Sequence, residues 1–248
     1  MDKQEQQRFS GSLIFSGILL LILWMVKVIE LSFDTSFSEF GILPQSASGL
    51  RGILFSPLLH ADVKHLSANS VPFFVLAAGL FYYYGKKSYL ILLLSWLITG
   101  FWVWVFANDT GIHIGASGVV YALAAFHFTG GLLRREPRMM AFSMLVVFLY
   151  GGLVWGMFPK FYPENISWES HLLGALAGVV LAFAFRSEGP QRKVYHWDDD
   201  EDDIENLENE SVEGENAVDR MPVSSKSELP DTDNEQHLRI NYTFKEKE

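Results

Sequence analysis

Ser117 lies in a short run of small residues, Gly115-Ala116-Ser117-Gly118, just before a long apolar stretch. A substrate backbone can approach a serine flanked by glycines closely, and the backbone N–H of that serine can face a developing oxyanion. Small residues at helical spacing also serve a plainer purpose, since they let two helices pack tightly. The motif therefore indicates either a nucleophile or a close helix contact.

His171 opens another apolar stretch, in which Gly174 and Gly178 follow on the same helical face. These glycines predict close contact with a neighbouring helix, and the imidazole stands at the outer end of that contact. A single buried histidine is commonly a structural group bonded to a carbonyl. A neutral imidazole within hydrogen-bond reach of a serine hydroxyl, however, is what activates a nucleophile. We therefore expect Ser117 as nucleophile and His171 as its base.

A third polar group precedes the second apolar stretch, where His65 and Asn69 stand four residues apart and share a helical face. An amide and an imidazole N–H that point the same way suit an oxyanion. The alternative is that the two side chains cap the helix and hold the preceding loop. His60, five residues earlier, is expected to brace that loop.

Six apolar blocks without Asp or Glu position these residues. A block of about twenty residues matches the roughly 30 Å hydrocarbon core of a bilayer. The second and sixth are short, so we expect both to begin earlier. This pattern predicts an all-α membrane protein with a short N-terminus (1–8), a six-span domain (9–186) and a tail (187–248), the six blocks being Phe9–Val26, Val71–Tyr84, Tyr89–Ala107, Gly115–Leu133, Met139–Phe158 and His171–Phe185.

The basic residues predict the orientation. With six crossings, four groups of Lys and Arg at the block ends fall on one side, which the positive-inside rule assigns to the cytoplasm. The segments on the other side, 27–66, 108–114 and 159–170, carry few basic residues for their length. Both termini are therefore expected in the cytoplasm, and the three polar groups lie toward the outer face. The basic residues that carry this prediction are Lys3, Arg8, Lys86, Lys87, Arg134, Arg135, Arg138, Arg186, Arg192 and Lys193.

The charge is uneven along the 248 residues. The formal net charge of −10 divides into +3 for residues 1–197 and −13 for residues 198–248. No basic surface of the kind that nucleic acid requires is present, and the absence of cysteine excludes disulfides and thiolate metal sites. The acidic tail is expected to be largely disordered. Its alternation Leu238, Ile240, Tyr242, Phe244 is either chance or a strand that docks on a soluble partner.

Taken together, the motifs resemble those of the rhomboid intramembrane serine proteases, in their bacterial six-span form. The likeness covers about residues 10–186 and includes the order and spacing of Ser-Pro-Leu-Leu-His (56–60), His65…Asn69, Gly115-Ala116-Ser117-Gly118 with Tyr121, and His171…Gly174…Gly178. One departure is Arg51-Gly52, which stands where rhomboids often carry Trp-Arg to brace the outer loop.

The resemblance implies a Ser117–His171 dyad without an aspartate, and no metal or cofactor. Asn69, His65 and the Ser117 N–H would bind the oxyanion, and Tyr121 would stack on the base. The implied substrates are single-span membrane proteins cleaved near the outer face, in contact with lipid and in a bacterial plasma membrane.

Two other functions stay open. A rhomboid relative without proteolytic activity could act as a binding or quality-control protein. A channel would need polar residues below Tyr121, where His127 is the only ionisable side chain before Arg134. We interpret His127 as a bonded interior group. The outer-side histidines at 60, 65, 113 and 171 lack a carboxylate or cysteine at metal-ligand spacing.

Overall fold

The computed structural model describes residues 3–108, 111–149, 155–158 and 167–191. The chain divides into two compact units, 1–193 and 194–248, and all described residues belong to the first. Every regular element in the described part is helical. The α-helices are α1 (Lys3–Ser32), α2 (Gly52–Phe55), α3 (Val63–Tyr84), α4 (Lys87–Phe106), α5 (Ser117–Arg134), α6 (Pro137–Leu149) and α7 (Trp168–Ala184); the 3₁₀ turns are η1 (Ser38–Phe40), η2 (Ala47–Arg51), η3 (Ser56–Leu58) and η4 (Trp155–Met157).

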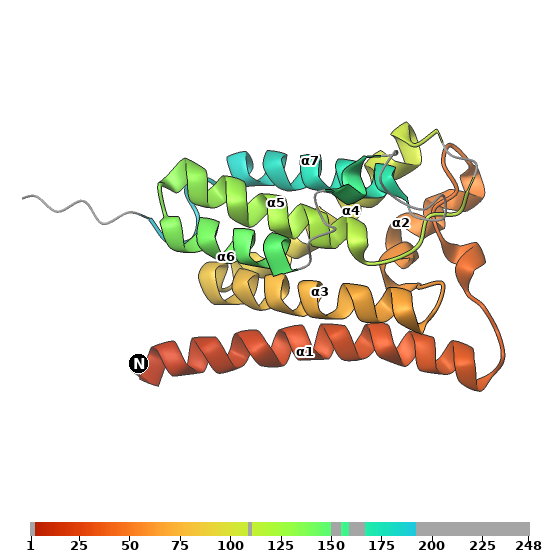
Figure 1. Ribbon diagram of the computed structural model, residues 1–248, viewed down its shortest axis with the longest axis horizontal. Coiled ribbons are helices and arrows are strands. Elements are labelled where there is room, and N and C mark those ends of the chain that lie inside the picture. Colours follow the sequence, from red (N-terminus) through yellow and green to blue (C-terminus); the bar gives the residue numbers. More distant parts are fainter. Residues whose placement is uncertain (1–2, 109–110, 150–154, 159–166, 192–248) are drawn as a thin grey trace, which may run out of the picture. The chain divides into compact units, whose positions relative to one another are not determined.

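The six predicted blocks correspond to α1 and α3–α7, which run side by side along the bundle (Figure 1). Among the described residues, α1, α3 and α4 are long and apolar enough to cross a membrane, and α6 and α7 are shorter apolar helices. Within the fifth block, residues 150–154 lie outside the described residues, and Trp155–Met157 form the separate turn η4. The tail with its alternating segment also lies outside the described residues.

As expected, the helices of the second and sixth apolar blocks, α3 and α7, begin before those blocks. Asp62 caps α3 by accepting the His65 N–H at 2.7 Å, and Ser167 caps α7 by accepting the Ser170 N–H at 3.2 Å. A capping oxygen satisfies an N–H that has no partner inside the helix. The polar first turns of α3 and α7 therefore form part of the helices and carry His65 and His171.

Close packing of α5 on α7 fixes how the two halves of the predicted dyad meet. A Cβ added at Gly174 would overlap the carbonyl of Gly118, and one added at Gly178 would overlap that of Ala122. Only glycine lets the backbones approach so closely. The predicted small-residue contact is confirmed, and it brings the first turns of α5 and α7 together.

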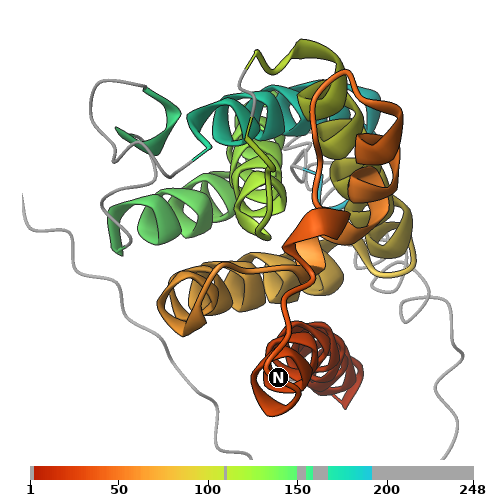
Figure 2. The same ribbon diagram turned by 90° about the vertical axis from the view of Figure 1, so that its right-hand side faces the viewer.

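The segment between α1 and α3, residues 33–62, packs on α4 at one end of the bundle, and Figure 2 looks along the bundle toward that end. We call it the outer segment because the sequence predicts it on the outer side of the membrane. Trp104 Nε1 donates to the Ser46 carbonyl at 2.8 Å, and Trp96 Nε1 donates to the Ile53 carbonyl at 3.1 Å. Arg51 bonds the Glu39 carbonyl at 3.0 Å and lies 4.4 Å over the Phe40 ring. Arg51 thus braces this segment although the Trp-Arg pair is absent.

Candidate active site

Ser117 is the first residue of α5, and the chain enters it through a tightly held turn. The Gly115 N–H donates to the Ser56 carbonyl at 2.9 Å, and the Ala116 N–H donates to His60 Nε2 at 3.3 Å. Gly115 has φ +116°, and a Cβ there would lie 2.8 Å from the His65 ring. Glycine is therefore required at 115 for both its backbone conformation and the space.

His171 lies opposite Ser117 on α7 and is held on both ring nitrogens. Its Nδ1 is 2.9 Å from the Gly156 carbonyl, and its Nε2 is 2.9 Å from Ser117 Oγ. A carbonyl oxygen only accepts, so Nδ1 carries the proton and Nε2 is left as the acceptor for the serine hydroxyl. This tautomer is the one that takes a proton from a nucleophile.

Tyr121, one helical turn after Ser117, packs against one face of the imidazole of His171. Its ring stacks on His171 with centroids 4.2 Å apart and planes 12° apart. His171 is only 6% exposed, so the ring has little freedom to turn away. The contact places Tyr121 where the resemblance to rhomboids implies it.

His65 and Asn69 lie on α3 beside the turn that leads into Ser117. A Cβ on Gly115 would be 2.8 Å from His65 Nε2 and 3.8 Å from Asn69 Nδ2. Asn69 Nδ2 also donates to the His65 carbonyl at 3.2 Å, which uses one of its two N–H groups.

His60 was expected to brace its own loop, and in the structure it contacts the turn that leads into Ser117. Its ring meets that of His65 edge to face at 5.0 Å. Burial and the neighbouring His65 lower the pKa of His60 to about 3, so the ring is neutral at physiological pH. A neutral ring can accept the Ala116 N–H through Nε2 and so hold the backbone one residue before Ser117.

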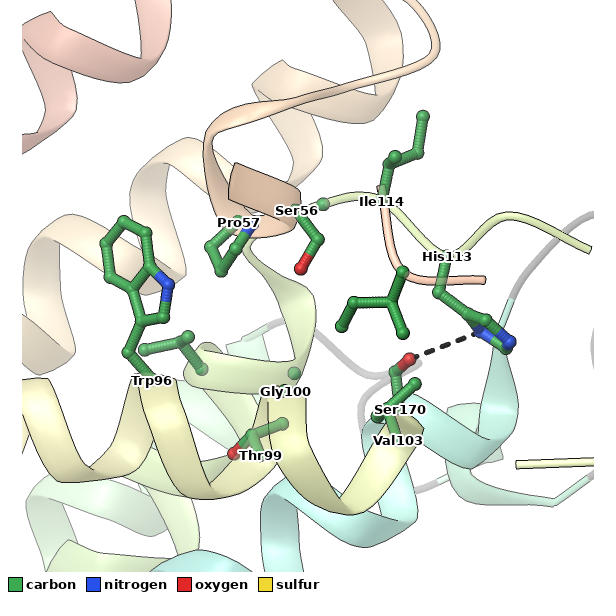
Figure 3. A pocket seen from close by; sticks show the side chains of 13 residues that line it. Ser56, Pro57, Trp96, Thr99, Gly100, Val103, His113, Ile114 and Ser170 are labelled. Carbon is green, nitrogen blue, oxygen red and sulfur yellow. Dashed lines mark hydrogen bonds between the residues drawn. The ribbon is translucent and has the colours of Figure 1, made fainter. Parts of the chain in front are cut away.

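A small cavity with a mixed lining lies next to the turn, between the outer segment, α4 and the start of α7 (Figure 3). It measures about 20 Å³, which is room for one water molecule. Ser56, Thr99, His113 and Ser170 give it polar walls. The Thr99 hydroxyl has no hydrogen-bond partner among the described residues.

Two residues near the site, Gly156 and His113, were given no role in this site from the sequence. Gly156 supplies the carbonyl for His171, and a Cβ there would overlap the Tyr121 hydroxyl. His113 Nδ1 contacts the hydroxyls of Ser167 and Ser170 at the start of α7. Two backbone bonds, of 3.0 and 2.8 Å, also pair His113 with Ile42 of the outer segment. Neither Gly156 nor His113 belongs to a recognisable motif. Only the glycine-rich sequence around 151–156 marks the region of Gly156 as unusual.

His127 lies on α5, away from this site. Its Nε2 is 3.1 Å from the Leu76 carbonyl, and its ring is fully buried. It is a bonded interior group, which is the interpretation preferred from the sequence. Within the described ranges, no three His, Asp or Glu side chains are grouped so that they could hold a metal ion.

Comparison with known proteins agrees with this architecture. The family model described as "Rhomboid domain" matches residues 47–188. The chain is 33% identical over 195 residues to "Uncharacterized protein Rv1337" of Mycobacterium tuberculosis, covering 74% of this chain and 78% of the relative. It is 30% identical over 127 residues to "Putative rhomboid protease YdcA" of Bacillus subtilis, covering 51% of this chain and 62% of the relative. With the motifs of 56–178 lying in one helical bundle inside the matched region, the chain belongs to the rhomboid family.

Proposed function

We propose that this chain is an intramembrane serine endopeptidase that cleaves single-span membrane proteins near the outer membrane face. One observation carries the proposal: the 2.9 Å contact between His171 Nε2 and Ser117 Oγ, with Nδ1 engaged by the Gly156 carbonyl. A serine hydroxyl, a correctly protonated imidazole and a group that orients the imidazole are the parts that nucleophilic acyl transfer needs.

In the first step, Ser117 Oγ attacks the scissile carbonyl carbon while its proton moves to His171 Nε2. The imidazolium then gives that proton to the leaving amine, and the C–N bond breaks to leave an acyl-enzyme. A water molecule then gives a proton to His171 and attacks the ester carbonyl carbon. The bond between that carbon and Ser117 Oγ breaks, Oγ takes the proton back from His171, and the second product leaves as a carboxylic acid. The Tyr121 ring lies against the imidazolium face and stabilises its charge.

The negative charge on the carbonyl oxygen develops next to the N-terminus of α5. The Ser117 N–H is at the first turn of that helix, where backbone donors have no partner inside the helix and the helix dipole favours an anion. The side chains of Asn69 and His65 border the same turn. We assign these three donors to the oxyanion.

The substrate must expose a peptide bond, because a fully hydrogen-bonded helix hides its carbonyls. We therefore expect single-span proteins whose helices unwind easily near the outer face. The proposal includes six crossings of a bacterial plasma membrane, cytoplasmic termini, lipid contact around the bundle and a soluble partner for the acidic tail.

The proposal is tested by co-expressing the protein with single-span reporter proteins and following cleavage. Ser117→Ala should abolish cleavage. Ser143→Ala is the matched control, since that buried serine donates to the Ala124 carbonyl at 2.7 Å and belongs to α6. Cleavage that persists in Ser117→Ala, or no cleavage of any reporter by the wild type, would favour the alternative of an inactive rhomboid relative with a binding or quality-control role.

A further inference from the structure

A buried ion pair near the outer end of α1 joins Lys27 to Glu30. Nζ and Oε2 are 2.6 Å apart, and the two side chains are 8% and 4% exposed. Taking two charges out of water is unfavourable unless both also find hydrogen-bond partners. The partners that they find connect the pair to the rest of the molecule.

Both partners are backbone groups of the outer segment. Glu30 Oε1 accepts the Phe37 N–H at 2.7 Å, and Lys27 Nζ donates to the Ala61 carbonyl at 3.4 Å. Phe37 immediately precedes η1, and Ala61 follows η3 just before α3 begins. One ion pair therefore holds the two ends of the segment 37–61 against the same turn of α1.

The segment held in this way also holds the backbone that leads into Ser117. Ser56 accepts the Gly115 N–H, and His60, the neighbour of Ala61, accepts the Ala116 N–H. A displacement of residues 56–61 would therefore move the turn 115–117 and the N–H that faces the oxyanion. Small misplacements of reacting groups cost catalytic rate strongly.

The simpler interpretation is that the pair only attaches α1 to the bundle. That attachment has other support, because Trp24 Nε1 donates to Ser70 Oγ of α3 at 3.0 Å and α1 packs along α3 (Figure 1). The bonds to Phe37 and Ala61 reach the outer segment, and α1 does not need them to dock on α3.

We propose that Lys27 and Glu30 are positioning residues of the reaction, which fix the outer segment so that Ser56 and His60 hold the turn before Ser117. Neither residue touches the substrate, so their effect is on the rate of the bound complex. This inference rests on the proposed protease function for its kinetic test. Its structural test does not depend on that function.

The informative variant is Lys27→Met/Glu30→Met, which removes both charges together and leaves no unpaired charge in the interior. Trp24→Phe is the control, because it removes a different bond from the same helix. Lys27→Arg keeps a donor and a charge. We would measure kcat and KM on a reporter substrate, thermal unfolding, and hydrogen exchange of the backbone amides of residues 113–118.

The double variant should remain folded, with kcat about tenfold lower, KM within about twofold of wild type and faster exchange at Gly115 and Ala116. Lys27→Arg should recover most of the rate, and Trp24→Phe should match wild type in kcat and exchange. Wild-type kcat and exchange in the double variant would overturn the inference. An equal loss of kcat in Trp24→Phe would also overturn it, since any loosening of α1 would then suffice. If the wild type proves inactive, the proposed function fails, and the exchange measurement alone still decides this inference.

Discussion

Two buried histidines in the same bundle each bond a backbone carbonyl through one ring nitrogen, but the groups around the two rings differ. His171 bonds the Gly156 carbonyl through Nδ1, and His127 bonds the Leu76 carbonyl through Nε2. The second nitrogen of His171 meets the Ser117 hydroxyl, whereas that of His127 has no partner among the described residues. The neighbours of the two rings differ as well: Tyr121 stacks flat on His171, and Phe142 meets His127 edge on at 5.4 Å.

The comparison shows that burial and a carbonyl bond alone do not provide the arrangement on which the role proposed for His171 depends. A carbonyl bond fixes which nitrogen carries the proton, and it does so for both rings. Chemistry depends on what the other nitrogen faces. His171 faces a hydroxyl at a helix N-terminus, where negative charge is favoured, while His127 is enclosed by the interior of α3, α5 and α6.

The largest expected effect separates the two histidines directly. His171→Ala should lower kcat by about 10⁴-fold or more, because the base that accepts the Ser117 proton is lost. His127→Leu should leave kcat within about twofold of wild type. The measurement is reporter cleavage by purified protein at matched folded concentration. A comparable loss in both variants would mean that burial in the bundle matters and the Ser117 contact does not.

The next prediction concerns the carbonyl that orients His171. In Gly156→Ala the new Cβ would overlap the Tyr121 hydroxyl and lie 3.1 Å from His171 Nδ1. We expect kcat to fall by about 100-fold, because the imidazole would be displaced and its Nε2 would no longer point at Ser117 Oγ. Gly17→Ala on α1 is the control, since nothing lies within 4 Å of its Cβ. Full activity of Gly156→Ala would show that this carbonyl contact does not set the geometry.

A smaller effect is expected from the stacked ring. Tyr121→Leu removes the aromatic face against the imidazolium, and a cation–π contact of about 1 kcal/mol corresponds to about fivefold in rate. Tyr121→Phe keeps the ring and should stay closer to wild type. The measurement is the single-turnover rate of each variant on a reporter peptide. If both variants lose the same rate, the role belongs to the hydroxyl and the stacking argument is wrong.

The smallest effect on activity is expected at His127, where the change is in stability. Substitution by leucine removes the hydrogen bond between His127 Nε2 and the Leu76 carbonyl, and a bond of this kind contributes about 1 kcal/mol to stability. Thermal unfolding in detergent should therefore occur at a lower temperature while the rate per folded molecule is kept. A variant as stable as wild type would mean that the bond between His127 and Leu76 does not contribute to stability.

Much of this arrangement could be predicted from the sequence. Apolar block length indicated the helices, and the glycines after Ser117 and His171 predicted the backbone contact that brings the two residues together. These signals are local, since each depends on residue type and spacing within one helix. Polar caps are local as well, and Asp62 and Ser167 explain why two helices begin before their apolar blocks.

Other features depend on tertiary contacts and could not be predicted in this way. The first apolar block stops at Val26 because charged residues follow, yet α1 continues to Ser32. It does so because Lys27 and Glu30 neutralise each other three residues apart against the outer segment. The role of Gly156 could not be predicted for a similar reason: a backbone carbonyl leaves no mark in the sequence, and only the fold places that carbonyl beside His171.

The central claim is that His171 activates Ser117 in this rhomboid. The most direct measurement is labelling with a serine-directed fluorophosphonate, with the adduct located by peptide mass spectrometry. We predict an adduct on Ser117 in wild type and in His127→Leu, and none in His171→Ala. An adduct on another serine, or equal labelling of Ser117 in His171→Ala, would contradict the account.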